Sequence, residues 1–415
     1  MSSPRISSLS RYTIVGGGIG GLVVARRLAT AGRSVWLLEA SDRLGGTVAR
    51  HTVGGIDLDS GAESFATRGG TVAALATEVG LGGDLVTPSS AGAWLQPVSG
   101  PALPLPAASL LGIPGTPLAA DVLAVVGMAS ALRAQLDAVI PSLWARKSLT
   151  LGRLVRRRMG DGVLERLVAP VVHGVHSMHP DDIPLDRAAP GLRASLAMHG
   201  SLAAAVRSMR AAAPAGSAVA GIRGGVHRLV TELAADLEAL HVDVELGTRV
   251  TSLDGLDGTP IVAAPWGAPA GRAIVLATLV VDAPELDAAP RGTGMLVAQG
   301  ATAVRARALT HATAKWDWLR ERAGGRHVLR LSYDEEPESL EQTARSDAEA
   351  LLGVPLPPAS VVDFARVGWV RHAASAAVPE ALEGMIVVGE TVAGSGIAGI
   401  VAHAEKTAAE LLEDD

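Results

Sequence analysis

Apolar residues near the start of the chain alternate between short uninterrupted runs and a spacing of three to four residues. The run at 12–15 predicts a buried strand and leads into a glycine-rich turn at 16–21. Apolar positions at helical spacing follow over 22–28, and a second run at 34–38 predicts another strand, which ends at Glu39. Strand, glycine turn, helix, strand and acid is the order of a dinucleotide-binding βαβ unit.

Each glycine at the characteristic spacing of such a turn has a structural role. Gly16 permits the tight turn, Gly18 lets the backbone approach a pyrophosphate, and Gly21 lets the helix pack closely on the strand. Free N–H groups at the helix start face the phosphates, and Glu39 can accept a hydrogen bond from a ribose hydroxyl. A glycine-rich loop without a ligand is the alternative, and the flanking strands and the acid count against it. The residues expected to bind the dinucleotide here are Gly16, Gly18, Ile19, Gly20, Gly21 and Glu39.

The pattern changes again along the rest of the chain. A stretch at 101–117 that is rich in proline and small residues marks a boundary, and residues 118–213 then show helical spacing. A helix at 230–240 and a strand-like run at 242–246 follow the glycine pair at 224–225. Further apolar runs, which suggest a mostly antiparallel sheet and then a last buried strand, lie at 273–281, 294–297, 327–333 and 385–388.

The residues after Glu39 resemble the second signature of flavoproteins with two dinucleotide-binding domains, where Arg43 and the glycines around Gly46 line the FAD pyrophosphate. The stretch 59–64 is similar to the loop that covers the flavin in that group. Val250 stands where related flavoproteins contact adenine through the backbone.

Near the C-terminus, Glu390 stands where such flavoproteins place an acid beside the ribityl chain, and the helix after it directs its positive end at the flavin. The resemblance implies FAD. The further residues it assigns to FAD are Ala40, Arg43, Gly46, Thr47, Gly61, Ala62, Glu63, Ser64, Val250, Glu390, Ile397, Ala398 and Gly399.

These features predict an α/β protein with a Rossmann-like two-dinucleotide-binding-domain FAD fold, an antiparallel-sheet substrate domain and a helical insertion. The FAD-binding domain is expected in three parts, with the helical domain and the substrate-binding sheet domain inserted between them. The expected bounds are 1–90, 214–265 and 381–415 for the FAD-binding domain, 91–213 for the helical domain and 266–380 for the sheet domain.

Composition narrows the class of protein. The formal net charge of −6 argues against nucleic acid as a partner, and the absence of cysteine excludes disulfides, thiolate metal sites and a cysteinyl link to flavin, so FAD is expected without a covalent bond. The sequence contains no uncharged apolar stretch of about 18 residues, so no membrane span is predicted. Residues 1–10 lack the apolar region of a signal peptide. We expect a cytoplasmic protein.

Across nearly its whole length the chain resembles the protoporphyrinogen/coproporphyrinogen oxidase family, the oxygen-dependent FAD enzymes of haem biosynthesis. The resemblance is carried by Gly61-Ala62-Glu63-Ser64-Phe65 with Arg68, by Gly174-Val175-His176 with 180–185, by 223–229 and by the pair Lys315-Trp316. The connection between Val250 and Ala273 is short for the family, which suggests that accessory structure of the FAD domain is trimmed there.

The resemblance implies an FAD oxidase that converts coproporphyrinogen III to coproporphyrin III in three two-electron rounds, with O₂ reduced to H₂O₂ in each. A composition typical of GC-rich genomes favours this bacterial reaction. The alternatives are a protoporphyrinogen IX oxidase, or a flavin amine oxidase or desaturase of the same fold. Amine oxidases carry an aromatic residue close to the C-terminal glycine-acid motif, and 390–399 contains none.

Several side chains are weaker candidates. His173, His176 and His179 have metal-like spacing, but Gly174 and Pro180 argue against a continuous helix there, so no metal site is expected. His176 is a candidate for the substrate pocket.

Lys315 is a candidate for ordering water during flavin reoxidation, as a lysine does in amine-oxidase relatives. Arg68 could pair with a substrate propionate, and a surface arginine is the equal alternative. Trp316, Trp318 and Trp369 are more readily packing residues than the walls of a substrate slot.

The arginines 153 and 156–158 are expected on a solvated helix face, with contact to acidic lipid as the alternative. The expected partners are a porphyrinogen and O₂, without nucleic acid. A peripheral contact with a membrane or with ferrochelatase is left open, as are the identity of a catalytic base and the oligomeric state.

Overall fold

The computed structural model describes residues 11–141, 148–176, 178–212, 219–266, 271–371, 382, 384–394 and 396–414. The chain divides into two compact units. The first comprises 1–87, 218–274 and 367–415, and the second comprises 88–217 and 275–366.

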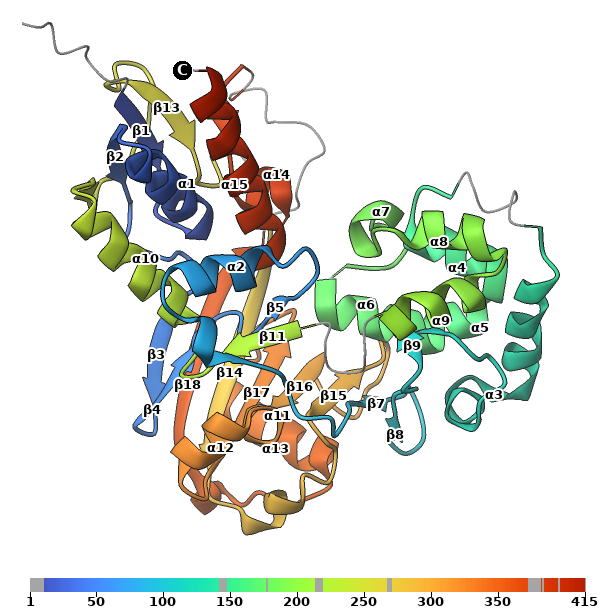
Figure 1. Cartoon of the computed structure of the whole chain (residues 1–415). Coiled ribbons are helices and arrows are strands. Elements are labelled where there is room, and N and C mark those ends of the chain that lie inside the picture. Colours follow the sequence, from blue (N-terminus) through green and yellow to red (C-terminus); the bar gives the residue numbers. More distant parts are fainter. Residues whose placement is uncertain are drawn as a thin grey trace, which may run out of the picture. The chain divides into compact units, whose positions relative to one another are not determined.

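The first unit is built on a five-stranded sheet in the order β12-β2-β1-β13-β19, and all of its strand pairs are parallel. Helix α1 packs against α10 and α15 (Figure 1). The apolar faces of these helices and of the central strands form one buried core, as expected for a sheet whose parallel strands read as continuous apolar runs. The elements are β1 (Arg11–Val15), α1 (Ile19–Thr30), β2 (Ser34–Leu38), α10 (His227–Ala239), β12 (Asp243–Glu245), β13 (Thr259–Val262), β19 (Ile386–Val387) and α15 (Ile397–Asp414).

Smaller elements complete this unit. The strands β3 and β4 form an antiparallel hairpin, and β5, β11 and β6 form a three-stranded sheet. Their bounds are β3 (Arg50–Val53), β4 (Ile56–Asp59), β5 (Phe65–Ala66), α2 (Thr71–Glu78), η1 (Gly82–Asp84), β6 (Leu85–Val86), β11 (Val219–Ile222) and α14 (Glu390–Ala393).

The second unit contains a seven-stranded sheet in the order β18-β14-β17-β16-β15-β7-β8. The pairs β14–β17, β16–β17, β15–β16 and β7–β8 are antiparallel, whereas β15 and β7 are parallel. The elements of this sheet and its covering are β7 (Trp94–Gln96), β8 (Leu103–Pro104), β14 (Arg272–Val281), η5 (Pro284–Ala288), β15 (Gly294–Val297), β16 (Ala308–His311), α11 (Ala312–Lys315), α12 (Asp317–Ala323), β17 (His327–Tyr333), α13 (Leu340–Leu352), η6 (Pro358–Ser360) and β18 (Val361–Arg371).

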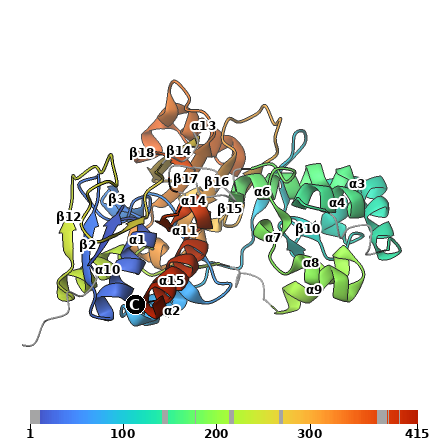
Figure 2. The same ribbon diagram turned by 90° about the horizontal axis from the view of Figure 1, so that it is seen from above.

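A helical layer with its own core forms the rest of the second unit. Helix α3 lies at the outer end of this layer in both views (Figure 1, Figure 2). The elements are β9 (Ser109–Leu110), β10 (Ile113–Pro114), α3 (Ala120–Gln135), η2 (Leu136–Ala138), α4 (Leu151–Met159), α5 (Asp161–Val163), the π-helical η4 (Leu164–Val168), α6 (Ala169–His176), α7 (Leu185–Ala188), α8 (Leu192–His199) and α9 (Leu202–Ala212).

The predicted α/β class is confirmed, and the predicted strand at 294–297 has the bounds of β15. The predicted helix at 22–28 is longer in the structure, because α1 begins at Ile19, within the glycine-rich stretch 16–21, and continues to Thr30. The expected domain bounds stay a prediction. No strand lies within 249–258, so the described part of the connection from Val250 to β13 is a short irregular segment.

The stretch with the three histidines is not one continuous helix, as expected, because α6 ends at His176, ahead of His179 and Pro180. Gly174 lies inside α6, where a Cβ would contact the end of the Leu296 side chain. One expectation is wrong: Arg158 is not on a solvated face, because its side chain is fully buried.

Buried Arg158 is neutralised inside the helical layer. Its Nε lies 2.5 Å from Oδ1 of Asp137, and its other nitrogens donate to backbone carbonyls, including that of Gly200 at 3.0 Å. A charge can stay buried only when it is paired and hydrogen-bonded in this way. The neighbouring Arg153 and Arg157 are exposed, as expected.

Candidate functional site

A cavity of about 430 Å³ lies in the first unit, at the carboxyl ends of β1, β2 and β13. Gly16, Gly18, Ile19 and Gly20 line it, and α1 begins beside it at Ile19. No side chain caps the first turn of α1, so its N–H groups are available to an anion. This is the usual position of a ligand in an open parallel sheet.

Gly16 and Gly21 have the steric roles predicted for the turn. Gly16 has a φ of +111°, and a Cβ there would lie 2.8 Å from the backbone N of Ala264. A Cβ at Gly21 would collide with the carbonyl oxygen of Gly16, so the helix touches the strand backbone directly. At Gly18 an added Cβ would meet no atom within 4 Å. The wall of the cavity is therefore open at Gly18.

Glu39 lies at the end of β2 and lines the cavity. Its Oε2 accepts a hydrogen bond from Gly17 N at 2.6 Å, and its Oε1 accepts from N and Oγ of Ser41 at 2.8 and 2.7 Å. Burial opposes ionisation of this carboxyl, but the hydrogen bonds from Ser41 and Gly17 outweigh burial and hold the pKa of Glu39 below its ordinary value. Glu39 is thus an ionised acceptor, suited to hydroxyl donors.

The second glycine turn closes the cavity from another side. Gly45, Gly46 and Thr47 line it, and Gly45 N donates to the carbonyl of Gly17 at 2.8 Å. Arg43 does not line the cavity; its Nη1 donates to the carbonyl of Gly46 at 2.9 Å and so stabilises the turn.

Some of the candidate residues in the later part of the chain line the cavity, and others do not. Glu390 lines the cavity, and Val250 lines it from the segment after β12. Ile397, Ala398 and Gly399 form the start of α15, of which Ile400 reaches the cavity. The loop at 61–64 is absent from the wall.

Several wall residues were missed by sequence reasoning. They are Thr248 and Arg249 ahead of Val250, the segment 263–266 after β13, and Gly389. Apart from Arg249 and Trp266 they are small or uncharged, so they carry no chemical signal in the sequence. The available signal was topological, because ligands bind outside the carboxyl ends of parallel strands.

The histidines of the second unit have separate partners. Nε2 of buried His173 lies 3.0 Å from Oδ2 of Asp334, and its Nδ1 lies 3.3 Å from Nε2 of Gln299. Nδ1 of His179 lies 3.5 Å from Oδ2 of Asp181. The side chain of His176 is outside the described part of the structure. Among the described residues no group of three or more histidine, cysteine, aspartate or glutamate side chains could hold a metal.

The other candidates lie in different surroundings. Lys315 ends α11, and its Nζ lies 5.1 Å from the centroid of the Trp316 ring. Trp316 is buried, whereas Trp318 and Trp369 are half-buried. Arg68 is exposed in the loop after β5.

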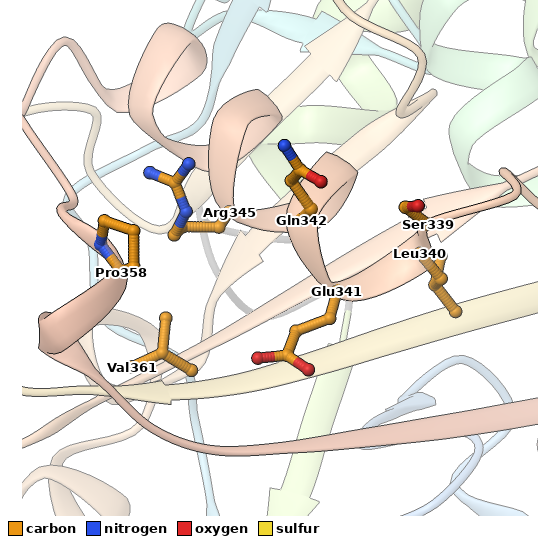
Figure 3. A pocket seen from close by; sticks show the side chains of 7 residues that line it. All are labelled: Ser339, Leu340, Glu341, Gln342, Arg345, Pro358 and Val361. Carbon is orange, nitrogen blue, oxygen red and sulfur yellow. The ribbon is translucent and has the colours of Figure 1, made fainter.

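A second cavity, of about 480 Å³, lies in the second unit between the start of α13 and the start of β18 (Figure 3). Its wall includes Leu340, Glu341, Arg345, Pro358 and Val361. It contains none of the residues expected to bind FAD and no glycine-rich turn. The first cavity is therefore the candidate cofactor site.

The family of flavin containing amine oxidoreductases matches residues 19–278. The chain is 31% identical over 393 residues to the coproporphyrinogen III oxidase of Mycobacterium tuberculosis, with 84% of each chain covered. It is also 31% identical over 375 residues to the coproporphyrinogen III oxidase of Mycobacterium leprae, with 81% of this chain and 80% of that protein covered.

Solved structures agree on the fold. The putative protoporphyrinogen oxidase from Exiguobacterium sp. 255-15 aligns with a TM-score of 0.80 at 22% identity, over 98% of this chain and 99% of that chain. Putrescine oxidase bound to putrescine aligns with a TM-score of 0.62 at 16% identity, over 98% and 99% of the two chains.

The fold and the site define an FAD-dependent oxidoreductase. The chain belongs to the flavin containing amine oxidoreductases and, within them, to the family that includes the mycobacterial coproporphyrinogen III oxidases. The predicted family and the predicted cofactor FAD are confirmed. The substrate is a small molecule, and O₂ is the electron acceptor. Among the helices that the structure describes, none is long and apolar enough to cross a bilayer.

Proposed function

We propose that this protein oxidises coproporphyrinogen III to coproporphyrin III. The observation that carries the proposal is the 31% identity to a coproporphyrinogen III oxidase over 84% of both chains. The reaction removes six hydrogen atoms as three pairs, and each pair reduces one O₂ to one H₂O₂. Bound FAD would supply the hydride acceptor, and the protein supplies orientation and a place shielded from water.

Substrate choice is tested by comparing porphyrinogens directly. Purified protein is incubated with coproporphyrinogen III or protoporphyrinogen IX, and porphyrin fluorescence and H₂O₂ are recorded together. We expect a higher kcat/KM for coproporphyrinogen III and one H₂O₂ per electron pair. A clear preference for protoporphyrinogen IX would overturn the substrate while leaving the flavin assignment standing.

Within the cofactor cavity we propose that FAD lies with its pyrophosphate against the glycine turns at 16–21 and 45–47. Glu39 then accepts from the ribose, Val250 meets the adenine, and Glu390 with the start of α15 faces the flavin. The positions that support this placement are the open wall at Gly18 and the ionised Glu39.

The bond to FAD is proposed to be non-covalent, because the chain has no cysteine to form a thioether link. The protein should purify yellow, and denaturation should release FAD into the supernatant. Recovery of FMN alone, or of no flavin even after reconstitution, would contradict this assignment.

Arg68 is proposed to bind a substrate propionate. Its exposed side chain has no ion-pair partner among the described residues, so it can accept one without breaking an existing contact. A well-formed charged hydrogen bond contributes about 1.5–3 kcal/mol, so Arg68→Ala should narrow the preference for the substrate with four propionates. Arg223→Ala is the matched control, since Arg223 is also exposed in the first unit.

Lys315 and His176 keep their proposed roles in flavin reoxidation and in the substrate pocket. Lys315→Met should slow the reoxidation of reduced flavin by O₂ while leaving its reduction by porphyrinogen unchanged. Equal effects of Lys315→Met on both half-reactions would contradict its role in reoxidation.

His176→Phe should raise KM more than it lowers kcat.

We also propose that the protein makes a peripheral contact with an anionic membrane through α3 and η2. Met128, Leu132, Leu136 and Val139 follow one another at helical spacing and are 60%, 53%, 52% and 77% exposed. Such an apolar stripe on a helix suits the bilayer interface. Exposed Arg157 on neighbouring α4, whose carbonyl accepts from Arg133 of α3 at 3.1 Å, adds positive charge.

Sedimentation with vesicles tests this contact. The protein should bind phosphatidylglycerol vesicles and not phosphatidylcholine vesicles, and Leu132→Glu should abolish binding while leaving porphyrinogen oxidation intact. Retention of a ferrochelatase by the wild-type protein alone, without vesicle binding, would replace the membrane proposal by a protein contact.

A further inference from the structure

Asp59, the last residue of β4, is a buried carboxylate that the proposed chemistry leaves without a role. It is 7% exposed, and it is the first residue of the stretch 59–64, whose sequence resembles a flavin-covering loop. Its Oδ2 accepts from Val226 N at 2.9 Å, and its Oδ1 accepts from His227 N at 2.8 Å and from Nδ1 of His227 at 2.9 Å. Three bonds thus tie the end of β4 to the first turn of α10.

Both tied elements support the second glycine turn of the cofactor cavity. A Cβ at Gly61 would collide with the carbonyl oxygen of Thr47, so the loop after β4 packs directly on the turn. A Cβ at Gly45 would lie 2.9 Å from Cγ1 of Val230, so α10 packs on the turn from another side. Gly45 and Thr47 line the cavity.

The backbone before α10 is closely packed against Asp59. Gly225 has a φ of +112°, and a Cβ there would lie 3.0 Å from Oδ1 of Asp59. The chain before α10 is therefore shaped to bring two N–H groups to one carboxylate. Carboxylates at a helix N-terminus are stabilised by these donors and by the helix dipole.

We propose that Asp59 and His227 are positioning residues for FAD: they lock β4 to α10, and these two elements hold the turn 45–47 in the conformation that binds the pyrophosphate. The role rests on the proposed assignment of this cavity to FAD. It predicts that loss of the hydrogen bonds between Asp59 and the start of α10 lowers the affinity for FAD beyond what the loss of protein stability explains.

The test uses Asp59→Asn with a matched control in the second unit. Asp347 is a similar buried carboxylate, since it accepts from Arg305 N at 3.1 Å, from Ala306 N at 2.8 Å and from Tyr333 Oη at 3.1 Å. Asp59→Asn places an amide N–H against a backbone N–H, as does Asp347→Asn, so both should lower the Tm of the apoprotein.

The two variants should differ in flavin binding. We expect the Kd for FAD, from quenching of flavin fluorescence, to rise by about tenfold or more in Asp59→Asn and to stay within about twofold in Asp347→Asn. The visible circular dichroism of bound flavin should change only in Asp59→Asn. Equal FAD affinities in the two variants, with equal losses of Tm, would overturn the proposal.

Substitutions at His227 keep the proposal testable if Asp59→Asn does not fold. His227→Ala removes only the ring contact and should raise the Kd for FAD about threefold, and His227→Asn, whose amide can replace Nδ1, should restore it. Failure of this rescue would count against positioning. If Gly18→Val leaves FAD affinity intact, the cavity assignment itself fails, which separates the two outcomes.

Discussion

At Gly18 the wall of the cofactor cavity has no side chain, and an added Cβ would face empty space rather than protein atoms. The backbone there has an ordinary φ of −69°, so a larger residue can be tolerated by the fold itself. In the proposed placement of FAD, a side chain at this position would displace the pyrophosphate.

Gly18→Val should therefore lose nearly all FAD and activity while the protein stays folded, with a Tm of the apoprotein within a few degrees of wild type. Flavin content after reconstitution is the measurement. Gly83→Val is the matched control, because a Cβ at Gly83 also meets no atom within 4 Å but lies outside the cavity. Full flavin occupancy in Gly18→Val would show that the pyrophosphate binds elsewhere.

His311 gives a residue-scale prediction about pH. Its Nε2 lies 3.0 Å from Nδ1 of His327, and burial, reinforced by His327 and Arg320, lowers the pKa of His311 to about 3. Because the folded-state pKa is below the unfolded value of about 6.5, the unfolded chain takes up a proton that the folded one excludes. The stabilisation is complete above pH ~6.5 and is lost as the pH falls towards 3.

Urea unfolding between pH 7 and pH 4 should therefore show a falling midpoint in the wild type, and His311→Phe should show a shallower fall. The pKa of His327 is lowered as well, by burial above all, so the slope should not vanish in this variant. Identical slopes in the two proteins would contradict the assignment of acid sensitivity to His311.

Residue-scale prediction from the sequence worked where geometry leaves one choice of residue. Gly16 and Gly21 must be glycine because backbone atoms occupy the space of a side chain, and spacing alone identified both. It failed for Arg158, because three adjacent arginines read as one solvated face. Arg158 can be buried because it pairs with Asp137. Asp137 is distant in sequence, so no local pattern predicts the pair.

At the scale of elements, the Arg158–Asp137 pair joins α4 to η2 and to Gly200 after α8. Asp137 also accepts from Ala203 N at 2.8 Å, so four segments of the helical layer meet at one buried ion pair. Removing a single partner leaves an uncompensated charge in the core.

Arg158→Met should destabilise the second unit by about 3–5 kcal/mol, measured by urea unfolding. Adding Asp137→Leu should recover part of this loss, since the lone carboxylate is then gone. Arg153→Met is the control on the same helix, and as an exposed change it should shift stability by less than about 0.5 kcal/mol. A cost for Arg153→Met equal to that of Arg158→Met would contradict the role of burial.

Element prediction followed the length and regularity of the apolar runs. β14, β15 and β17 were predicted because they are continuous apolar or alternating segments that pack in one core. β7 was missed because three residues carry too little periodicity, and β16 was missed because Thr310 and His311 interrupt its apolar run. The expected break between His173 and His179 is present, because α6 ends at His176, but Gly174 itself lies within the helix although glycine is a poor helix former.

On the scale of the whole molecule, binding of FAD can distinguish between the two cavities described above as its site. The wall of the cofactor cavity comes from separate segments of the first unit, whereas the cavity at α13 and β18 belongs to the second. A ligand stabilises the elements that bind it, by about 2.7 kcal/mol at a hundredfold excess over Kd.

Adding FAD to the apoprotein should slow hydrogen exchange most in the segments 15–22, 38–47, 248–250 and 262–266. Exchange in 339–361 should change little. Protection concentrated in 339–361 would move the cofactor to the other cavity and would contradict the placement proposed above.

The order of the cavity segments along the chain has a consequence for biosynthesis. Gly16 and Glu39 are translated before the second unit, but Glu390 and Ile400 complete the same wall after the second unit has been made. Because chains fold from the N-terminus as they emerge, the helical layer and the seven-stranded sheet can form while the nucleotide fold is still unfinished. In the proposed placement of FAD, the wall that holds the cofactor is complete only once residue 400 has left the ribosome, so we expect the cofactor to bind after the second unit has been synthesised.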